Sequence, residues 1–432
     1  MNSRSLLNRR ACLVAVGFTL SFLASTGQTE NWPQWRGEGR AGLWREVQLP
    51  EQLCQDKIEK RWSTGLGGGF SGIAVVDGKV LTMDQQKDRQ LERVVCLLSQ
   101  DGSNIWTHEY EADYGDLDWG NGPRSTPTVY GHQVYTLGTL GRLTCLRLLD
   151  GKRIWSIDLQ ETFGGKHPVW GHAASPLVAN DLVYVQAGGK PGATVVAIDC
   201  KTGEERWRVL NDRPGYSSPL IAQIDGLEQL LIWTADSLVG LDPSSGSQIW
   251  RVPFRTSNYD VAIISPVTNR QRVFISGYWD GGAVYDLKST ASPVRLWRSS
   301  RISCLMSTPL TSGNYLYVLD KRDGFLCVDW RNGNILWKDE HQLTPKRRNP
   351  HATLVWAQPS TLGDDSPSEA VAIDALGDFI LVRLTPKGFE DRGRVRIIEG
   401  QGTPIWAPPA FSGQNVYVRS DREILSIRVL AK

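Results

Sequence analysis

The stretch that decides the fold of this 432-residue chain reads Ala197-Ile198-Asp199-Cys200-Lys201-Thr202-Gly203, with Trp207 four residues after the glycine. A β-rich segment, Val183-Tyr184-Val185, precedes it, and the unit opens at Ser175-Pro176. Proline suits the first residue of a strand, and a glycine in a tight hairpin turn supplies positive φ. The unit therefore predicts short strands joined by turns, with Trp207 at the start of the last strand.

The same order of features recurs along the chain. Six copies lie between about residues 70 and 340, and only the copy that opens at Ser265-Pro266 lacks the turn glycine. Four short strands fill an interval of this length in a propeller blade, and blades must stack because one blade cannot bury both of its faces. The tryptophans that mark the repeats, 40–52 residues apart, are Trp62, Trp106, Trp155, Trp207, Trp250, Trp297 and Trp337.

The two ends of the chain decide the number of blades. A degenerate unit runs from His351 to about Ile397, and the last unit ends near Ile427 without a tryptophan strand. The orphan strand around Trp62 can complete that last unit. These features predict an all-β, eight-bladed β-propeller of four-stranded antiparallel blades, with the ring closed by the N-terminal strand. Seven blades is the alternative, if the degenerate unit is not a blade.

The first residues have the features of an export signal. Arg9-Arg10 precede an apolar run over residues 11–24, which small and polar residues follow. We therefore expect a signal peptide at 1–27, an N-terminal extension at 28–61 and a single propeller domain at 62–432.

The apolar run is short for a membrane span of about 20 residues. An uncleaved anchor is the alternative. A Sec-type signal fits better than a twin-arginine signal, because Asn8 and Ala11-Cys12 match the usual twin-arginine flanks poorly. No later run is long enough to span a membrane. The sequence thus predicts a periplasmic or exported protein, with no transmembrane span in the mature chain.

Composition excludes several classes of function. The chain is 41% hydrophobic and 22% charged, with 43 glycines and 17 tryptophans, which is unlike a polytopic membrane protein or a disordered one. Its net charge is +2, and removing Arg4, Arg9 and Arg10 leaves 45 basic against 46 acidic residues. No run of five or more basic residues occurs. A nucleic-acid partner is therefore not expected, and we expect a monomer.

The repeat resembles the pyrroloquinoline quinone (PQQ)-like β-propeller repeat over about residues 60–430. Two further stretches, Asn31–Gly37 and Tyr114–Arg124, resemble exported, stand-alone PQQ-like propellers of planctomycete-type bacteria. Two groups of proteins share this repeat. One is the quinoprotein alcohol dehydrogenases, and the other is the non-catalytic propeller subunit of the outer-membrane protein assembly machine.

The cysteines and histidines offer no clear chemical site. Cys96, Cys145 and Cys327 each lie six residues before a turn glycine, where other repeats have alanine or glycine, which predicts a small-residue packing position. Cys54, Cys200 and Cys304 remain unassigned. The absence of a Cys-x-x-Cys pair or a close histidine pair disfavours a tight zinc site or a c-type haem.

Candidate binding residues follow from the propeller topology. The chain crosses one face of the ring between the outer strand of one blade and the inner strand of the next, so residues before each inner strand should surround the channel mouth. A convergent polar and aromatic set is the usual sign of a binding site, although aromatic side chains can also simply plug the channel, with Arg124 satisfying backbone carbonyls. The candidates are Asn121, Arg124, Trp170, His172, Tyr216, Asp260, His351, Trp356 and Trp406, with Tyr259, Met306, Asp116 and Asp118 nearby.

Three functions remain open. Quinoprotein dehydrogenases hold PQQ between a tryptophan and a disulfide of adjacent cysteines, together with Ca²⁺ and an aspartate base. This chain has no adjacent cysteines and no haem motif, so no catalytic residue or metal ligand can be assigned. We therefore expect a non-catalytic binding or scaffold protein of the cell envelope, which contacts a protein or an extracellular polymer through its rim and channel mouth. PQQ- or quinone-dependent redox activity is the alternative, and carbohydrate recognition by the mouth aromatics is a further one.

Overall fold

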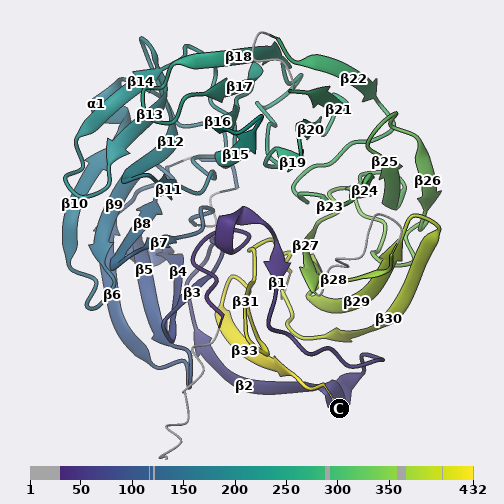
Figure 1. Cartoon of the computed structure of the whole chain (residues 1–432). Helices are drawn as coiled ribbons and strands as arrows, with labels where there is room; N and C mark the ends of the chain where they lie inside the picture. Colours follow the sequence, from purple (N-terminus) through teal and green to yellow (C-terminus); the bar gives the residue numbers. More distant parts are fainter. Residues whose placement is uncertain are drawn as a thin grey trace, which may run out of the picture.

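A computed structural model describes residues 30–115, 117–119, 122–287, 292–357, 366–400 and 402–431. The expected signal peptide lies outside these residues. The strands form eight sheets arranged as a ring around a central axis (Figure 1). The prediction of an eight-bladed, all-β propeller is confirmed, and the degenerate unit after His351 is a blade.

The first four blades follow one another along the chain, with the innermost strand first in each. Within a blade every pair of neighbouring strands is antiparallel. The blades consist of β3 (Ala74–Val76), β4 (Lys79–Gln86), β5 (Leu91–Leu98) and β6 (Asn104–Glu111); β7 (Thr128–Tyr130), β8 (Gln133–Leu137), β9 (Arg142–Arg147) and β10 (Arg153–Asp158); β11 (Leu177–Ala179), β12 (Leu182–Gly189), β13 (Ala193–Asp199) and β14 (Glu205–Val209); and β15 (Leu220–Ile224), β16 (Leu227–Trp233), β17 (Ser237–Leu241) and β18 (Gln248–Pro253).

The next three blades continue in the same order. They consist of β19 (Val267–Asn269), β20 (Arg272–Gly277), β21 (Gly281–Asp286) and β22 (Val294–Ser299); β23 (Leu310–Ser312), β24 (Tyr315–Asp320), β25 (Gly324–Asp329) and β26 (Ile335–Lys338); and β27 (Ala352–Ala357), β28 (Ser368–Asp374), β29 (Asp378–Thr385) and β30 (Gly388–Arg396). Helical segments are short, namely α1 (Leu159–Phe163), η1 (Glu38–Arg40), η2 (Gln55–Lys57) and η3 (Lys87–Arg89). No helix among the described residues is long and apolar enough to cross a membrane.

The eighth blade joins the two ends of the chain. Its three inner strands, β31 (Ala410–Ser412), β32 (Asn415–Arg419) and β33 (Glu423–Val429), come from the C-terminus, and its outer strand is β2 (Ile58–Gly65). β2 runs antiparallel to β33, with Ile58 opposite Val429 and Gly65 opposite Glu423. The predicted closure by the N-terminal strand is therefore confirmed.

The repeated tryptophans connect each blade to the next. The indole N–H of Trp106, for example, donates to the carbonyl of Leu148 in the following blade at 3.0 Å. The ring lies against the turn glycine of that blade, because a Cβ placed on Gly151 would come within 2.4 Å of it. Trp62, Trp155, Trp207, Trp297 and Trp337 donate in the same way to Ser99, Cys200, Pro243, Trp330 and Thr385.

Trp250 is the exception among the repeat tryptophans. Its N–H donates to Gln229 of its own blade at 2.7 Å. The following blade is the one whose repeat has no turn glycine. The contact to the next blade thus disappears where the turn that receives it is missing.

Small side chains face the repeat tryptophans inside each blade. Cys96, Cys145 and Cys327 lie directly opposite Trp106, Trp155 and Trp337, and all three cysteines are fully buried. Burial raises the pKa of each thiol to about 12. They therefore fill the small-residue packing position, and the six described cysteines are all free.

Residues 32–44 run into the centre of the ring (Figure 1). We call residues 32–40 the axial segment. It begins at the buried Trp32, whose backbone pairs with Val75, and it is followed by β1 (Leu43–Trp44), which runs parallel to the inner strand β27. The segment expected to be an extension thus adds a fifth strand to one blade and occupies the axis.

Two buried arginines attach the axial segment to opposite sides of the ring. Arg40 donates to the carbonyls of Pro176 at 2.7 Å and Pro219 at 2.8 Å, and Arg36 donates to the carbonyl of Leu354 at 3.2 Å. Burial lowers the pKa of Arg40 to about 9 and that of Arg36 to about 10. Backbone carbonyls within or just before the inner strands thus take the place of a carboxylate partner.

Replacing Arg40 tests this attachment. We expect Arg40→Met to lower the free energy of unfolding by about 3 kcal/mol or more, because several buried carbonyls lose their donor. Arg45→Met is the control, since Arg45 is exposed and its guanidinium pairs with the exposed Glu38; its cost should stay within about 0.5 kcal/mol. Urea unfolding monitored by tryptophan fluorescence measures both, and equal costs would contradict an anchoring role for Arg40.

Replacing a turn glycine tests the contact between blades. Gly151 and Gly226 both have positive φ, but only a Cβ at Gly151 would meet a tryptophan ring, while at Gly226 it would meet nothing. We expect Gly226→Ala to cost about 1–2 kcal/mol from backbone strain alone. Gly151→Ala should cost a further 1–3 kcal/mol or so, because Trp106 must move. Equal urea midpoints for the two variants would show that the ring contact contributes nothing.

Candidate functional site

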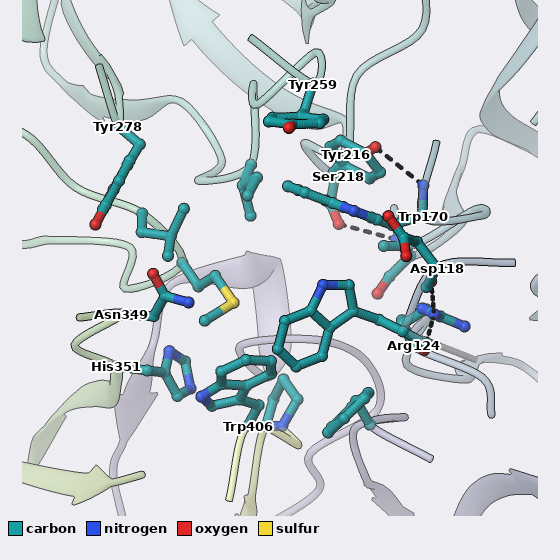
Figure 2. Close-up of a pocket in the computed structure, with 18 of the residues that line it drawn as sticks. Asp118, Arg124, Trp170, Tyr216, Ser218, Tyr259, Tyr278, Asn349, His351 and Trp406 are labelled. Atoms are coloured by element: carbon teal, nitrogen blue, oxygen red, sulfur yellow. Dashed lines mark hydrogen bonds between the residues drawn. The ribbon is translucent and has the colours of Figure 1, made fainter. Parts of the chain in front are cut away.

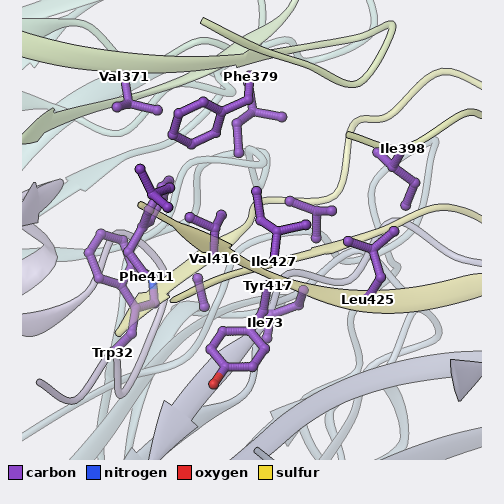
Figure 3. Close-up of a cluster of buried hydrophobic side chains, with 14 of the residues drawn as sticks. Trp32, Ile73, Val371, Phe379, Ile398, Phe411, Val416, Tyr417, Leu425 and Ile427 are labelled. Atoms are coloured by element: carbon purple, nitrogen blue, oxygen red, sulfur yellow. The ribbon is translucent and has the colours of Figure 1, made fainter. Parts of the chain in front are cut away.

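A cavity of about 690 Å³ lies at the channel mouth, which is the size of a typical small-ligand site. Its walls come from all eight blades, because each contributes residues just before its inner strand. Trp35 of the axial segment lines it as well. Figure 2 shows the side chains pointing into this space. The lining from the eight crossings includes Phe70, Arg124, Trp170, Tyr216, Tyr259, Met306, His351 and Trp406.

Five of the predicted site residues meet in this cavity. They are Arg124, Trp170, Tyr216, His351 and Trp406. The neighbouring candidates Asp118, Tyr259 and Met306 line it too. Asn121 and Asp116 fall outside the described residues.

Three other predicted site residues are not among the residues that line the cavity. Trp356 is the fifth residue of β27, and it packs edge-on against Tyr317 in the core between two blades, with its N–H bonded to the carbonyl of Thr311. Trp356 thus lies within the inner strand rather than before it, and the degenerate unit has no Ser-Pro to mark where that strand begins. The carboxylate of Asp260 pairs with Arg213, which also binds Asp236 at 2.8 Å.

His172 is the third of these residues. It is 3% exposed, and its Nε2 atom has no partner among the described residues. Burial lowers its pKa to about 4, so the ring is neutral at pH 7. Gly141 passes close to the ring, since a Cβ there would lie 3.1 Å from Nε2. His172 is therefore packed beside Gly141 and is not among the residues that line the cavity.

One wall of the cavity is a row of aromatic rings (Figure 2). Trp170 stacks between Tyr216 and Tyr259, with ring centroids 5.3 and 5.7 Å apart and planes within 26° of parallel. The Tyr216 hydroxyl accepts from the backbone N–H of Trp170 at 3.2 Å, which fixes the stack. Trp279 continues the row beside Tyr259. Tyr259 is 57% exposed and Trp279 43%, so the outer rings are open to solvent.

Trp119 and Trp406 form the opposite wall, with ring centroids 5.5 Å apart. Trp119 is 50% exposed and has a positive φ of 58°, which is uncommon for a bulky residue. Arg124 holds this loop, because its guanidinium donates to the carbonyls of Gly122 at 2.7 Å and of Trp119. Arg124 thus satisfies backbone carbonyls, as one interpretation of the sequence proposed, and it also positions an exposed tryptophan.

Two buried polar atoms on this side of the cavity have no partner among the described residues. They are the indole Nε1 of Trp406 and Nδ1 of His351. Burial lowers the pKa of His351 to about 4, so it is a neutral donor or acceptor at pH 7. Buried polar atoms are normally hydrogen-bonded. These two therefore leave hydrogen-bonding capacity beside the aromatic walls.

Sequence reasoning missed several lining residues. Tyr278 and Trp279 lie in the hairpin between β20 and β21, which reaches the same face as the crossings, and Trp35 lies on the axial segment. The adjacent Tyr-Trp pair at a hairpin tip was a usable signal, since the hairpin between the two middle strands of a blade returns to the mouth. Nothing comparable pointed to Trp35.

The site offers a ligand aromatic faces and hydrogen-bonding groups. Asp118 is the carboxylate among its described lining residues, and it is exposed. No group of three His, Cys, Asp or Glu side chains among the described residues is placed to hold a metal ion. A calcium ion takes six to eight oxygen ligands, so these residues do not fit the calcium that accompanies PQQ in the dehydrogenases.

Comparison with solved structures shows the same propeller fold in proteins of different activity. BamB from Moraxella catarrhalis is 18% identical, with 86% of this chain and 97% of that one covered at a TM-score of 0.58. Quinohemoprotein alcohol dehydrogenase from Comamonas testosteroni is 14% identical, with 95% and 82% covered at a TM-score of 0.63. A europium-containing methanol dehydrogenase is 12% identical, with 92% and 98% covered at 0.65. These identities establish the fold alone.

The sequence itself identifies the family. No curated protein matches the chain. The pattern of one family, described as outer membrane protein assembly factor BamB, matches residues 90–339, which is more than half of the chain and spans five of its tryptophan repeats. With its eight PQQ-type blades, the chain belongs to the BamB family.

Proposed function

We propose that this protein is a non-catalytic binding protein of the cell envelope, which holds a protein or an extracellular polymer at its channel mouth and rim. The observation that carries the proposal is the set of half-exposed aromatic rings, Trp119, Tyr259 and Trp279, around one concave site. Contiguous exposed apolar surface on a soluble protein marks an interaction site, and Trp and Tyr dominate binding energies at such sites.

The rigidity of the mouth supports the same proposal. The axial segment lies on the axis, and the stacked rings of Trp170 and Tyr216 are tied to the backbone. A preformed surface loses little conformational entropy on binding. The family description, an outer membrane protein assembly factor, supports a role in the envelope.

Binding of a quinone cofactor is the alternative function. Flat aromatic walls together with Arg124 and Arg348 suit a flat acidic ring system. The described lining, however, offers one carboxylate. The structural cysteines lie elsewhere, and burial raises their thiol pKa, which keeps them in the unreactive protonated form. The binding role therefore ranks first.

Calorimetric titration with PQQ, with and without Ca²⁺, separates these functions. We expect no calcium-dependent heat from the folded protein, because the described mouth residues lack a calcium ligand set. Micromolar or tighter binding that requires Ca²⁺ would establish the quinone alternative and would contradict a purely non-catalytic role.

Photo-crosslinking in the cells that produce the protein tests the binding role directly. A benzophenone amino acid replaces Trp279 at the mouth or, as a control, Tyr130, which is similarly exposed at the end of the inner strand β7. We expect a discrete high-mass adduct from position 279 and none from position 130. No adduct at 279, or the same adduct from both positions, would overturn the proposal.

A further inference from the structure

A second cavity of about 530 Å³ adjoins the aromatic one. Arg348, Asn349 and Trp406 line both cavities, so the two spaces are adjacent. The second space is bordered by Arg347, Arg396 and Glu399. The mouth thus combines an aromatic bowl with an adjacent basic cleft.

The cations of the cleft differ in how they are held. Arg396 pairs with Asp378 at 2.5 Å. Arg347 and Arg348 are exposed, and they belong to none of the ion pairs found among the described residues. Arg347 and Arg348 therefore place two neighbouring guanidinium groups at the cleft, which Glu399 also lines, and neither belongs to an ion pair between described residues.

The basic and aromatic parts of the mouth are joined by a hydrogen bond. The Tyr278 hydroxyl donates to the backbone carbonyl of Arg348 at 2.7 Å. Lys321 lies over the face of Tyr278, 4.4 Å from the ring centre, and holds this hairpin from behind. Arg348 is thus fixed next to the Tyr278-Trp279 pair, so one extended ligand can contact aromatic rings and guanidinium groups at the same time.

We infer that the mouth binds an oligosaccharide segment that carries carboxylate or sulfate groups. This inference rests on the proposed function and names the class of ligand for that site. Trp and Tyr faces are flat and apolar with a polar edge, which suits the C–H face of a pyranose ring. Guanidinium groups bind planar or tetrahedral oxyanions through two parallel hydrogen bonds. Asn349 and the unpartnered Trp406 N–H supply neutral contacts for sugar hydroxyls.

The arrangement favours a charged sugar over other anionic polymers. Single-stranded nucleic acids bind along a positively charged groove, whereas here Arg347 and Arg348 lie on one side of the mouth, at the cleft beside the aromatic cavity. Residues 28–432 also carry 45 basic against 46 acidic residues, which gives no general attraction for a polyanion. An acidic peptide would use the guanidinium groups but has no flat ring for the exposed faces of Trp119, Tyr259 and Trp279.

Titration of the mature protein with defined probes tests the inference through tryptophan fluorescence and calorimetry. The probes are a galacturonic acid hexamer, a sulfated chondroitin hexasaccharide, a neutral maltohexaose, a Glu-rich hexapeptide and oligo-dT. We expect saturable binding of at least one anionic sugar, at least tenfold tighter than maltohexaose, the peptide and oligo-dT. The two anionic sugars separate carboxylate from sulfate recognition.

Matched variants assign the binding to the two parts of the mouth. Trp279→Ala and the double variant Arg347→Ala/Arg348→Ala should each weaken binding at least tenfold, and only the double variant should abolish the sensitivity of binding to salt. One control is Tyr130→Ala, which removes an exposed side chain on β7. The other is Lys60→Ala/Arg428→Ala, which removes exposed side chains on β2 and β33 of the eighth blade. These controls should bind as the parent does.

Several results would overturn the inference. Neither anionic sugar binds, or maltohexaose binds as tightly as the anionic sugars. The peptide or oligo-dT binds more tightly than the anionic sugars, or the control variants lose as much affinity as the mouth variants. If these occur while position 279 still crosslinks in cells, the ligand class is wrong and the binding role stands. If position 279 also fails to crosslink, both are wrong.

Discussion

Every part of this protein depends on the contact between an indole N–H and a carbonyl of the neighbouring blade. A four-stranded sheet has two apolar faces, so a blade is stable only between two others. The tryptophan supplies both the apolar area and one directed hydrogen bond, and the turn glycine lets the backbone come against its ring. Six such contacts fix the angle between blades, and that angle brings residues from eight crossings to one mouth.

The axial segment occupies the centre of the ring and lines the cavity at its mouth. Arg36 reaches a carbonyl within the inner strand β27, Arg40 reaches carbonyls just before two other inner strands, and Trp35 lines the cavity. Buried arginines without carboxylate partners are unusual, and here backbone carbonyls substitute for them. Because the chain continues from the axial segment directly into β1 of a blade, this side of the cavity is tied to the ring.

The sequence predicted the repeating parts of the molecule well and the unique parts poorly. Turn glycines and tryptophans repeat, so the ring, its closure by the strand around Trp62 and five mouth residues were predictable. The anchoring role of Arg40 was not predictable, because its partners are backbone carbonyls, which every residue has. Trp356 lies within β27 rather than before it, in the unit whose repeat has no Ser-Pro to mark the start of the inner strand. Trp279 was missed because it lies in a hairpin within a blade rather than in a crossing between blades.

The pairing of β2 with β33 also decides when the ring can close during synthesis, which proceeds from the N-terminus. Ile58 and Val429 are opposite each other, although nearly the whole sequence separates them. Contacts between distant residues carry a high loop-closure entropy and form slowly. Until β33 emerges, β2 lacks the strand with which it pairs, and until Phe411 emerges, the buried faces of Trp32 and Trp44 lack the ring against which they pack. The ring is therefore completed only after β33 has been synthesised, and the N-terminal residues that pack on it need protection from aggregation until then.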